Sequence, residues 1–145
     1  MYSLQELLVR VFRDAGVPML AGTDAPATAA AVPGFSMHEE LRNMVAAGLT
    51  PYEALRAATA NPAEFLGATA EFGTVAVGRR ADLILLDGNP LKDIGNTAGL
   101  AGVMIRGRWL PRSELQTMLD DLAAANKRDP AWGKAPESKS PADRE

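Results

Sequence analysis

The chain has 145 residues, of which 47% are hydrophobic and 23% are charged, a composition typical of a folded globular protein rather than a disordered chain. Its length is well below the roughly 250 residues that a closed (β/α)₈ barrel needs. The formal charge of −3, with acidic and basic residues mixed along the chain, argues against a nucleic-acid partner. The absence of cysteine excludes disulfides, thiolate nucleophiles and cysteine-ligated metals.

The amino terminus predicts neither a signal peptide nor a membrane-spanning helix. Charged residues interrupt the apolar positions at the start of the chain, so no run of about 18 apolar residues exists there. We therefore expect a cytoplasmic protein that has no membrane partner. A single histidine, His38, limits the metal and acid–base chemistry that this chain can perform unaided.

The first elements in chain order are predicted to be a helix, a strand and a loop. Apolar residues recur at helical spacing over residues 4–15, and Gly16 follows where a left-handed cap would end that helix. Residues 17–21 are a short apolar run that predicts a buried parallel strand, with Asp24 at its end. Residues 25–35 contain two prolines and a glycine, which predicts a loop at a position where loops commonly carry function.

Two further helices are predicted from capping boxes, in which a hydroxyl side chain and a glutamate three residues later satisfy each other's backbone amides. The first box pairs Ser36 with Glu39, and the second pairs Thr50 with Glu53. The second helix is expected to be interrupted at residues 61–62, because the residue before a proline disfavours helical geometry.

After residue 67 the hydrophobic periodicity changes from that of a helix to that of strands. Strands are expected at residues 73–78 and 81–87, and a hairpin over residues 103–110. Residues 91–99 are expected to be irregular.

Four segments carry a specific likeness: GVPMLAGTDA at 16–25, SMHEELRNMVAAGLTPYEALRAATANPAEFLG at 36–67, FGTVAVGRRADLILLDGNPLKDI at 72–94 and VMIRGRWL at 103–110. Together they resemble the carboxyl-terminal third of the metal-dependent amidohydrolase superfamily, in its imidazolonepropionase-like and prolidase-like branch. The likeness keeps the family's order and spacing, so it is specific for the superfamily.

The resemblance implies an α/β fold: the carboxyl-terminal piece of a TIM barrel together with strands of the accompanying small β-sandwich. Residues 1–67 would then form the last strand and helices of an incomplete barrel, and residues 68–111 the sandwich strands. A carboxyl-terminal helix is expected at residues 112–126 and a disordered tail at residues 127–145. A buried parallel strand needs neighbours on both sides. We therefore expect a fragment of a longer enzyme, whose partner is the missing amino-terminal part of the barrel or a second copy.

The resemblance also assigns site residues. In the family the last barrel strand ends in an aspartate that binds or abuts the catalytic metal, and Asp24 occupies that position. It is expected to be a metal ligand and the general base; the alternative from the residues alone is a turn cap. His38 follows the loop and is expected to line the substrate pocket or, alternatively, to pack at a helix start.

The activity implied by the resemblance is hydrolysis of a C–N bond in a small-molecule substrate, a cyclic amide or a dipeptide-like amide, with a divalent metal, expected to be zinc. The family's His-x-His pair and its other ligands have no counterpart in this sequence, whereas a catalytic zinc takes three protein ligands plus water. We therefore expect this chain alone to bind no metal and to lack activity. The alternative is a non-catalytic assembly module that oligomerises through open strand edges.

Overall fold

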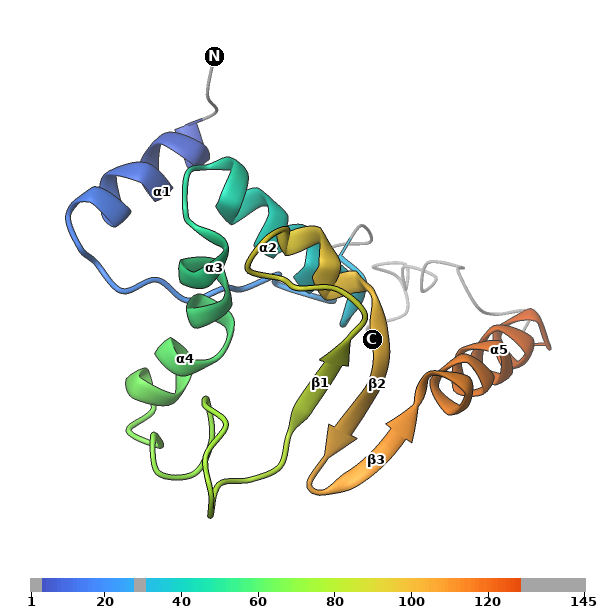
Figure 1. The fold of residues 1–145 in the computed structure, drawn as a ribbon. Helices are drawn as coiled ribbons and strands as arrows, with labels where there is room; N and C mark the ends of the chain where they lie inside the picture. The colour runs from blue at the N-terminus through green and yellow to red at the C-terminus, as the bar shows by residue number, and fades with distance from the viewer. Residues whose placement is uncertain (1–3, 28–30, 129–145) are drawn as a thin grey trace, which may run out of the picture. The chain divides into compact units, whose positions relative to one another are not determined.

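The computed structural model describes residues 4–27 and 31–128. The elements, in chain order, are α1 (Leu4–Asp14), α2 (Phe35–Ala46), α3 (Pro51–Ala58), α4 (Ala60–Phe65), β1 (Leu83–Leu86), the 3₁₀ helix η1 (Ile94–Ala98), β2 (Leu100–Ile105), β3 (Arg108–Pro111) and α5 (Arg112–Arg128) (Figure 1). The chain divides into two compact units, Met1–Arg112 and Ser113–Glu145, and everything discussed below as a site lies in the first. No helix in the described part of the chain is long and apolar enough to cross a membrane.

The first helix forms where it was predicted. Helix α1 covers Leu4–Asp14, and Gly16 adopts the left-handed conformation with φ 70°. The N–H of Val17 donates to the carbonyl of Phe12 at 2.9 Å, which closes the helix end as such caps do. The apolar stripe of α1 contains no buried residue, so this face is open in the chain as described.

The strand expected at residues 17–21 is not formed. This segment runs between α1 and α2 without a neighbouring strand (Figure 1). A parallel strand is stabilised only by adjacent strands, and the three strands of the described chain pair with one another. On one edge of the segment the backbone bonds to helices instead: the N–H of Ala21 donates to the carbonyl of Ala57 at 2.9 Å, and Asn61 Nδ2 donates to the carbonyl of Met19 at 2.9 Å.

The two predicted capping boxes have different outcomes. The box of Ser36 and Glu39 is wrong: α2 begins at Phe35, two residues earlier than a cap at Ser36 requires, and has no side-chain cap. The hydroxyl of Ser36 instead accepts from the N–H of Val32 at 2.8 Å. The box at the start of α3 is confirmed, because Thr50 Oγ1 accepts from the Glu53 N–H at 3.2 Å and Glu53 Oε2 accepts from the Thr50 N–H at 2.6 Å.

The helix interruption lies slightly earlier than expected. The break falls at Thr59, with φ −134° and ψ −80°, and α4 begins at the next residue. Residues 61–62 are therefore inside α4, where proline is tolerated because the first turn of a helix needs no N–H bond. Gly67 follows α4 with φ 66°, the left-handed conformation that commonly ends a helix.

The strand expected at residues 73–78 is also wrong. No strand is assigned there, and Val75 and Val77 are exposed. Gly73 and Gly78 have φ values of 94° and 85°, a left-handed geometry that bends the chain at both ends of the segment instead of extending it.

The other expected strands form an antiparallel sheet in the order β1-β2-β3. The strand predicted at 81–87 is confirmed in the shorter form of β1, and the hairpin predicted over 103–110 is confirmed as β2 and β3. Val103 is the centre of the register, since it pairs with Ile84 on one side and Leu110 on the other.

The segment expected to be irregular, residues 91–99, contains the 3₁₀ helix η1. Its start is fixed by Asp93, whose Oδ1 accepts from the N–H of Gly95 at 2.8 Å. Side-chain bonds of this kind are the usual way in which aspartate starts a turn. Helix η1 buries Ile94 and Thr97, and this burial was not predicted.

The core joins α2, α3 and η1. Its buried members are Leu41, Met44, Leu49, Ala54, Ala57 and Ile94. Because Ile94 comes from the loop between β1 and β2, this core connects the sheet segment of the chain to the helices. Removal of a leucine from such a contact normally destabilises a protein by about 2–5 kcal/mol.

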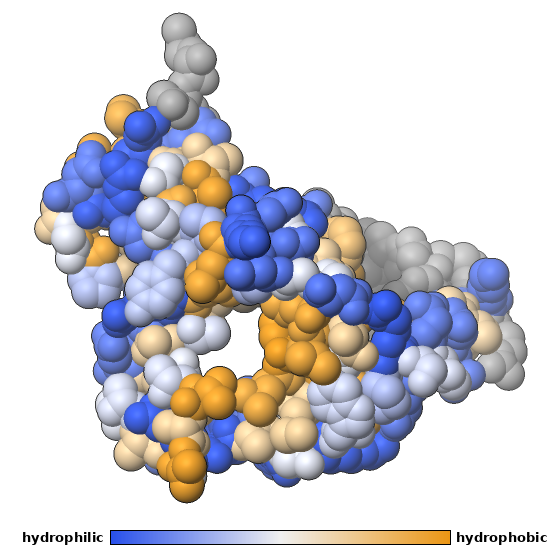
Figure 2. Space-filling view, viewed as in Figure 1, coloured by the Kyte–Doolittle hydropathy of each residue, from blue (hydrophilic) through white to orange (hydrophobic). Residues whose placement is uncertain are grey.

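The apolar residues of β1 are largely uncovered. Ile84 and Leu85 are exposed by 52% and 56%. Figure 2 shows apolar side chains gathered around a hollow, and a cavity of about 580 Å³ is lined by residues of β1, β2 and the segment at 72–75. The described chain therefore exposes apolar surface of the kind that is usually buried against another protein segment.

The carboxyl-terminal helix predicted at residues 112–126 is confirmed as α5, Arg112–Arg128. Lys127, the first residue of the predicted disordered tail, lies inside this helix. Residues 129–145, the remainder of that tail, lie outside the described residues.

Candidate functional site

Asp24 lies at the end of the segment that runs from α1, and its side chain is exposed. The residue has φ 53°, a left-handed conformation that aspartate tolerates better than most residues. Its backbone carbonyl accepts from the N–H of Ala27 at 2.7 Å. The preceding Thr23 accepts from the N–H of Ala25 through Oγ1 at 3.2 Å. These bonds shape a tight turn that presents the Asp24 carboxylate outward, where it has no hydrogen-bond partner among the described residues.

His38 lies at the end of the first turn of α2 and is half-buried. Its Nδ1 is 3.3 Å from Oγ1 of Thr97 in η1. Burial lowers the pKa of His38 below the ordinary value for histidine, and the nearby Arg42 lowers it further. Both effects favour the neutral imidazole over the imidazolium ion.

The structure does not join the two predicted site residues directly. No hydrogen bond links Asp24 to His38 in the described part of the chain. Residues 25–35 connect them in sequence, and three of these residues, 28–30, lie outside the described residues. Both remain site residues by prediction.

The described residues do not by themselves fit a catalytic metal. Zinc at a catalytic site takes three protein ligands and one water. Among residues 4–27 and 31–128 no three histidine, aspartate, glutamate or cysteine side chains come together as a metal site would require. Asp24 could give one carboxylate oxygen, and further ligands would have to come from outside the described residues.

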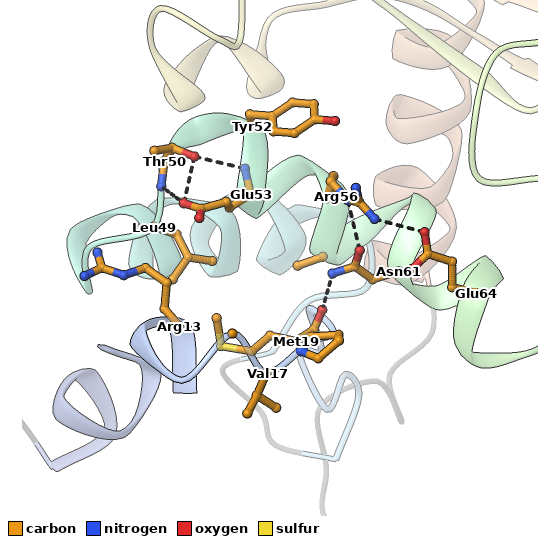
Figure 3. A pocket seen from close by; sticks show the side chains of 13 residues that line it. Arg13, Val17, Met19, Leu49, Thr50, Tyr52, Glu53, Arg56, Asn61 and Glu64 are labelled. Atoms are coloured by element: carbon orange, nitrogen blue, oxygen red, sulfur yellow. Dashed lines mark hydrogen bonds and ion pairs between the residues drawn. The ribbon is translucent and has the colours of Figure 1, made fainter. Parts of the chain in front are cut away.

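A second hollow, of about 440 Å³, lies between the start of the 17–21 segment and helices α3 and α4 (Figure 3). Several of its polar side chains are already paired: Arg56 donates to Asn61 Oδ1 at 3.2 Å and to Glu64 Oε1 at 2.9 Å. Glu53, also in the lining, belongs to the capping box, and the backbone and side-chain bonds from Thr50 hold the pKa of its carboxyl below the usual range. Neither Asp24 nor His38 lines this hollow.

The position of this hollow argues against a catalytic role. It is lined by residues 16–19, at the opposite end of the segment from Asp24. In the barrel that the sequence analysis expects, the catalytic groups would lie at the carboxyl end of this segment. We therefore interpret the hollow as a packing surface rather than as the reactive site.

The sequence analysis did not identify two residues that form contacts at the 17–21 segment and beside His38. Asn61 bonds both to the carbonyl of Met19 and to Arg56, but in the sequence it indicates only a helix break before proline. Thr97 is 1% exposed and contacts His38, yet no motif marks it. The aspartate and glycine at residues 93 and 95 were an available signal for the turn that buries it.

The sequence matches the amidohydrolase family over residues 6–110. The chain belongs to the amidohydrolase family. It is 46% identical to the imidazolonepropionase of Rubrobacter xylanophilus over 67 residues, which are 44% of this chain and 16% of that protein.

Solved amidohydrolase structures resemble it as well. A molinate hydrolase structure superimposes with a TM-score of 0.69 at 28% identity, covering 94% of this chain and 30% of that one. A Xaa-Pro dipeptidase structure with methionine bound in its active site superimposes with a TM-score of 0.64 at 28% identity, covering 73% of this chain and 25% of that one. This amidohydrolase chain thus spans less than a third of the length of each of these relatives, which include an imidazolonepropionase and a Xaa-Pro dipeptidase.

Proposed function

We propose that this chain is the carboxyl-terminal part of a metal-dependent amidohydrolase that hydrolyses a C–N bond in a small cyclic amide or dipeptide-like amide. The observation that carries the proposal is the family match over residues 6–110, which includes an exposed carboxylate, Asp24, at the end of an extended segment. The imidazolonepropionase and Xaa-Pro dipeptidase relatives support this substrate class.

In this proposal Asp24 is the catalytic carboxylate and one ligand of a divalent metal, with zinc the expected ion. As general base it takes a proton from the attacking water while the water oxygen bonds to the amide carbon. It then delivers that proton to the leaving nitrogen as the C–N bond breaks. An exposed carboxylate with no partner among the described residues is free for this exchange.

The proposal includes a partner, the amino-terminal part of the barrel. One edge of the 17–21 segment is occupied, because Met19 and Ala21 bond to α4 and α3. Along an extended backbone, successive residues face opposite edges, so Leu20 and Gly22 are left to receive a strand from that partner. The exposed apolar side chains of β1 would be covered in the same assembly.

The chain alone is proposed to be inactive, because its described residues supply too few ligands for a catalytic zinc. Purified chain should show no stoichiometric zinc by mass spectrometry and no hydrolysis of a Xaa-Pro dipeptide. Stoichiometric zinc on a monomeric chain would contradict this part of the proposal.

The central test is the substitution Asp24→Asn in an enzyme completed by co-expression with the amino-terminal part of a matching amidohydrolase. Turnover should fall by about 10²–10⁴-fold, the usual contribution of a general base. Asp121→Asn, an exposed position on α5, is the matched control and should leave turnover unchanged. Unchanged turnover in Asp24→Asn would contradict the catalytic role and show that Asp24 only caps a turn.

A second candidate function is a non-catalytic assembly module. The uncovered residues Ile84 and Leu85 on β1 favour it, since apolar edge strands readily pair with other chains. Light scattering separates the two functions. Assembly of the chain with the amino-terminal part into a one-to-one complex supports the enzyme, whereas a stable homo-oligomer that excludes this part supports the module.

A further inference from the structure

The hydroxyl of Thr97 is placed between two groups that can use it. It lies 2.8 Å from the backbone carbonyl of Ile94 and 3.3 Å from Nδ1 of His38. Thr97 is 1% exposed, so water does not compete for these contacts. A buried hydroxyl of this kind has one proton to donate and can accept further hydrogen bonds.

The chemistry of the carbonyl decides how the proton is used. A carbonyl oxygen can only accept, so the shorter contact takes the Thr97 proton. Oγ1 is then left as an acceptor toward His38, and Nδ1 must carry a proton to complete the contact. In a neutral imidazole the other nitrogen, Nε2, is unprotonated. Nε2 has no hydrogen-bond partner among the described residues.

We propose that Thr97 holds His38 as the Nδ1–H tautomer and that the Nε2 lone pair accepts a hydrogen bond from an N–H group of the amide substrate in the complete enzyme. The second half rests on the proposed function. His38 lies in the first turn of α2. The loop that follows Asp24 leads into this end of the helix. Thr97 is thus a positioning residue that acts through His38.

The neutral state that the tautomer requires agrees with the surroundings of His38. Partial burial and Arg42 both disfavour the imidazolium ion. Free imidazole side chains in water favour the Nε2–H form, so a Nδ1–H form in the folded protein would be a specific effect of Thr97.

The tautomer is tested by long-range ¹⁵N–¹H NMR on the full chain, at about pH 8, above the ordinary histidine pKa of about 6.5. The chain has one histidine, so the spectrum contains one imidazole. The ¹⁵N shifts should report a protonated Nδ1 and an unprotonated Nε2. A predominantly Nε2–H pattern in the folded wild-type chain would overturn the assignment. Thr97→Ser should keep the Nδ1–H pattern, and Thr97→Val should shift it toward Nε2–H; no shift in Thr97→Val would also overturn it.

The substrate contact is tested in the completed enzyme with His38→Asn, whose shorter side chain can reach Thr97 but offers no acceptor at the Nε2 position. The KM should rise about three- to tenfold, as expected for one lost hydrogen bond, with kcat less affected. Thr97→Val should raise KM in the same direction and Thr97→Ser should not. Unchanged KM in His38→Asn would overturn the substrate contact. Absence of any C–N hydrolysis by the wild-type complex would overturn the proposed function and this contact together, while the tautomer is judged by the NMR result alone.

Discussion

The bond from Asn61 to Met19 holds the segment before Asp24 against α4, and its removal gives a sharp prediction. The substitution Asn61→Ala deletes the donor to the Met19 carbonyl at 2.9 Å and the acceptor of Arg56 Nε at 3.2 Å. Each such bond contributes about 0.5–1.5 kcal/mol net. Arg56 keeps its ion pair with Glu64 at 2.9 Å, so the total loss should be about 1–2 kcal/mol.

The loss should be local, and hydrogen exchange can measure it. The amide of Ala21 bonds to Ala57 on the same edge of the segment, so it reports whether this edge stays closed. A loss of 1–2 kcal/mol corresponds to exchange that is about 5–30-fold faster. Amides in the middle of α2 should change little, because they do not depend on this contact.

Asn43→Ala is the matched control, since this asparagine is exposed on α2 and lies outside the segment. It should leave exchange at Ala21 unchanged. If Ala21 in Asn61→Ala exchanged as slowly as in the wild type, Asn61 would not hold the segment. A uniform increase at every amide would show that Asn61 acts on global stability instead.

Three other expectations concern stability. Thr50→Ala should lower the free energy of unfolding in urea by about 1 kcal/mol through loss of the cap, whereas Thr50→Ser should retain it; equal loss in both would show that the cap is not responsible. Because the Thr50 bonds lower the pKa of Glu53 in the folded state, their stabilisation is present above the unfolded pKa and is lost as pH falls through the folded pKa. Urea midpoints across an acid series should show this loss in the wild type but not in Glu53→Gln; parallel curves would contradict it. Gly73→Ala should destabilise by more than about 1 kcal/mol, because the added Cβ would lie 2.6 Å from Cβ of Ala63 at φ 94°, and an unchanged thermal midpoint would refute this.

Local chemistry was enough to predict several elements from the sequence. The cap of Thr50 and Glu53 requires only residues three apart, and it forms as predicted. Gly16 and Gly67 end helices because a left-handed residue is favoured there in any context. The hairpin of β2 and β3 likewise depends on a short turn and adjacent strands. The family was also evident from sequence, because its motifs are local and ordered.

Two failures occurred where the outcome depended on distant residues. Residues 17–21 have the composition of a buried strand, but a strand exists only where another strand supplies its hydrogen bonds; Ala57 and Asn61 bond to this segment instead. The contact of His38 with Thr97 joins residues 59 apart in sequence, and no local pattern encodes such a distance. The sequence by itself thus determined the end of α1, the start of α3, the hairpin and the family, since these depend on neighbouring residues. Only the tertiary structure decided which backbone groups are paired and which nitrogen of His38 faces a buried hydroxyl, because those depend on what the folded chain brings together.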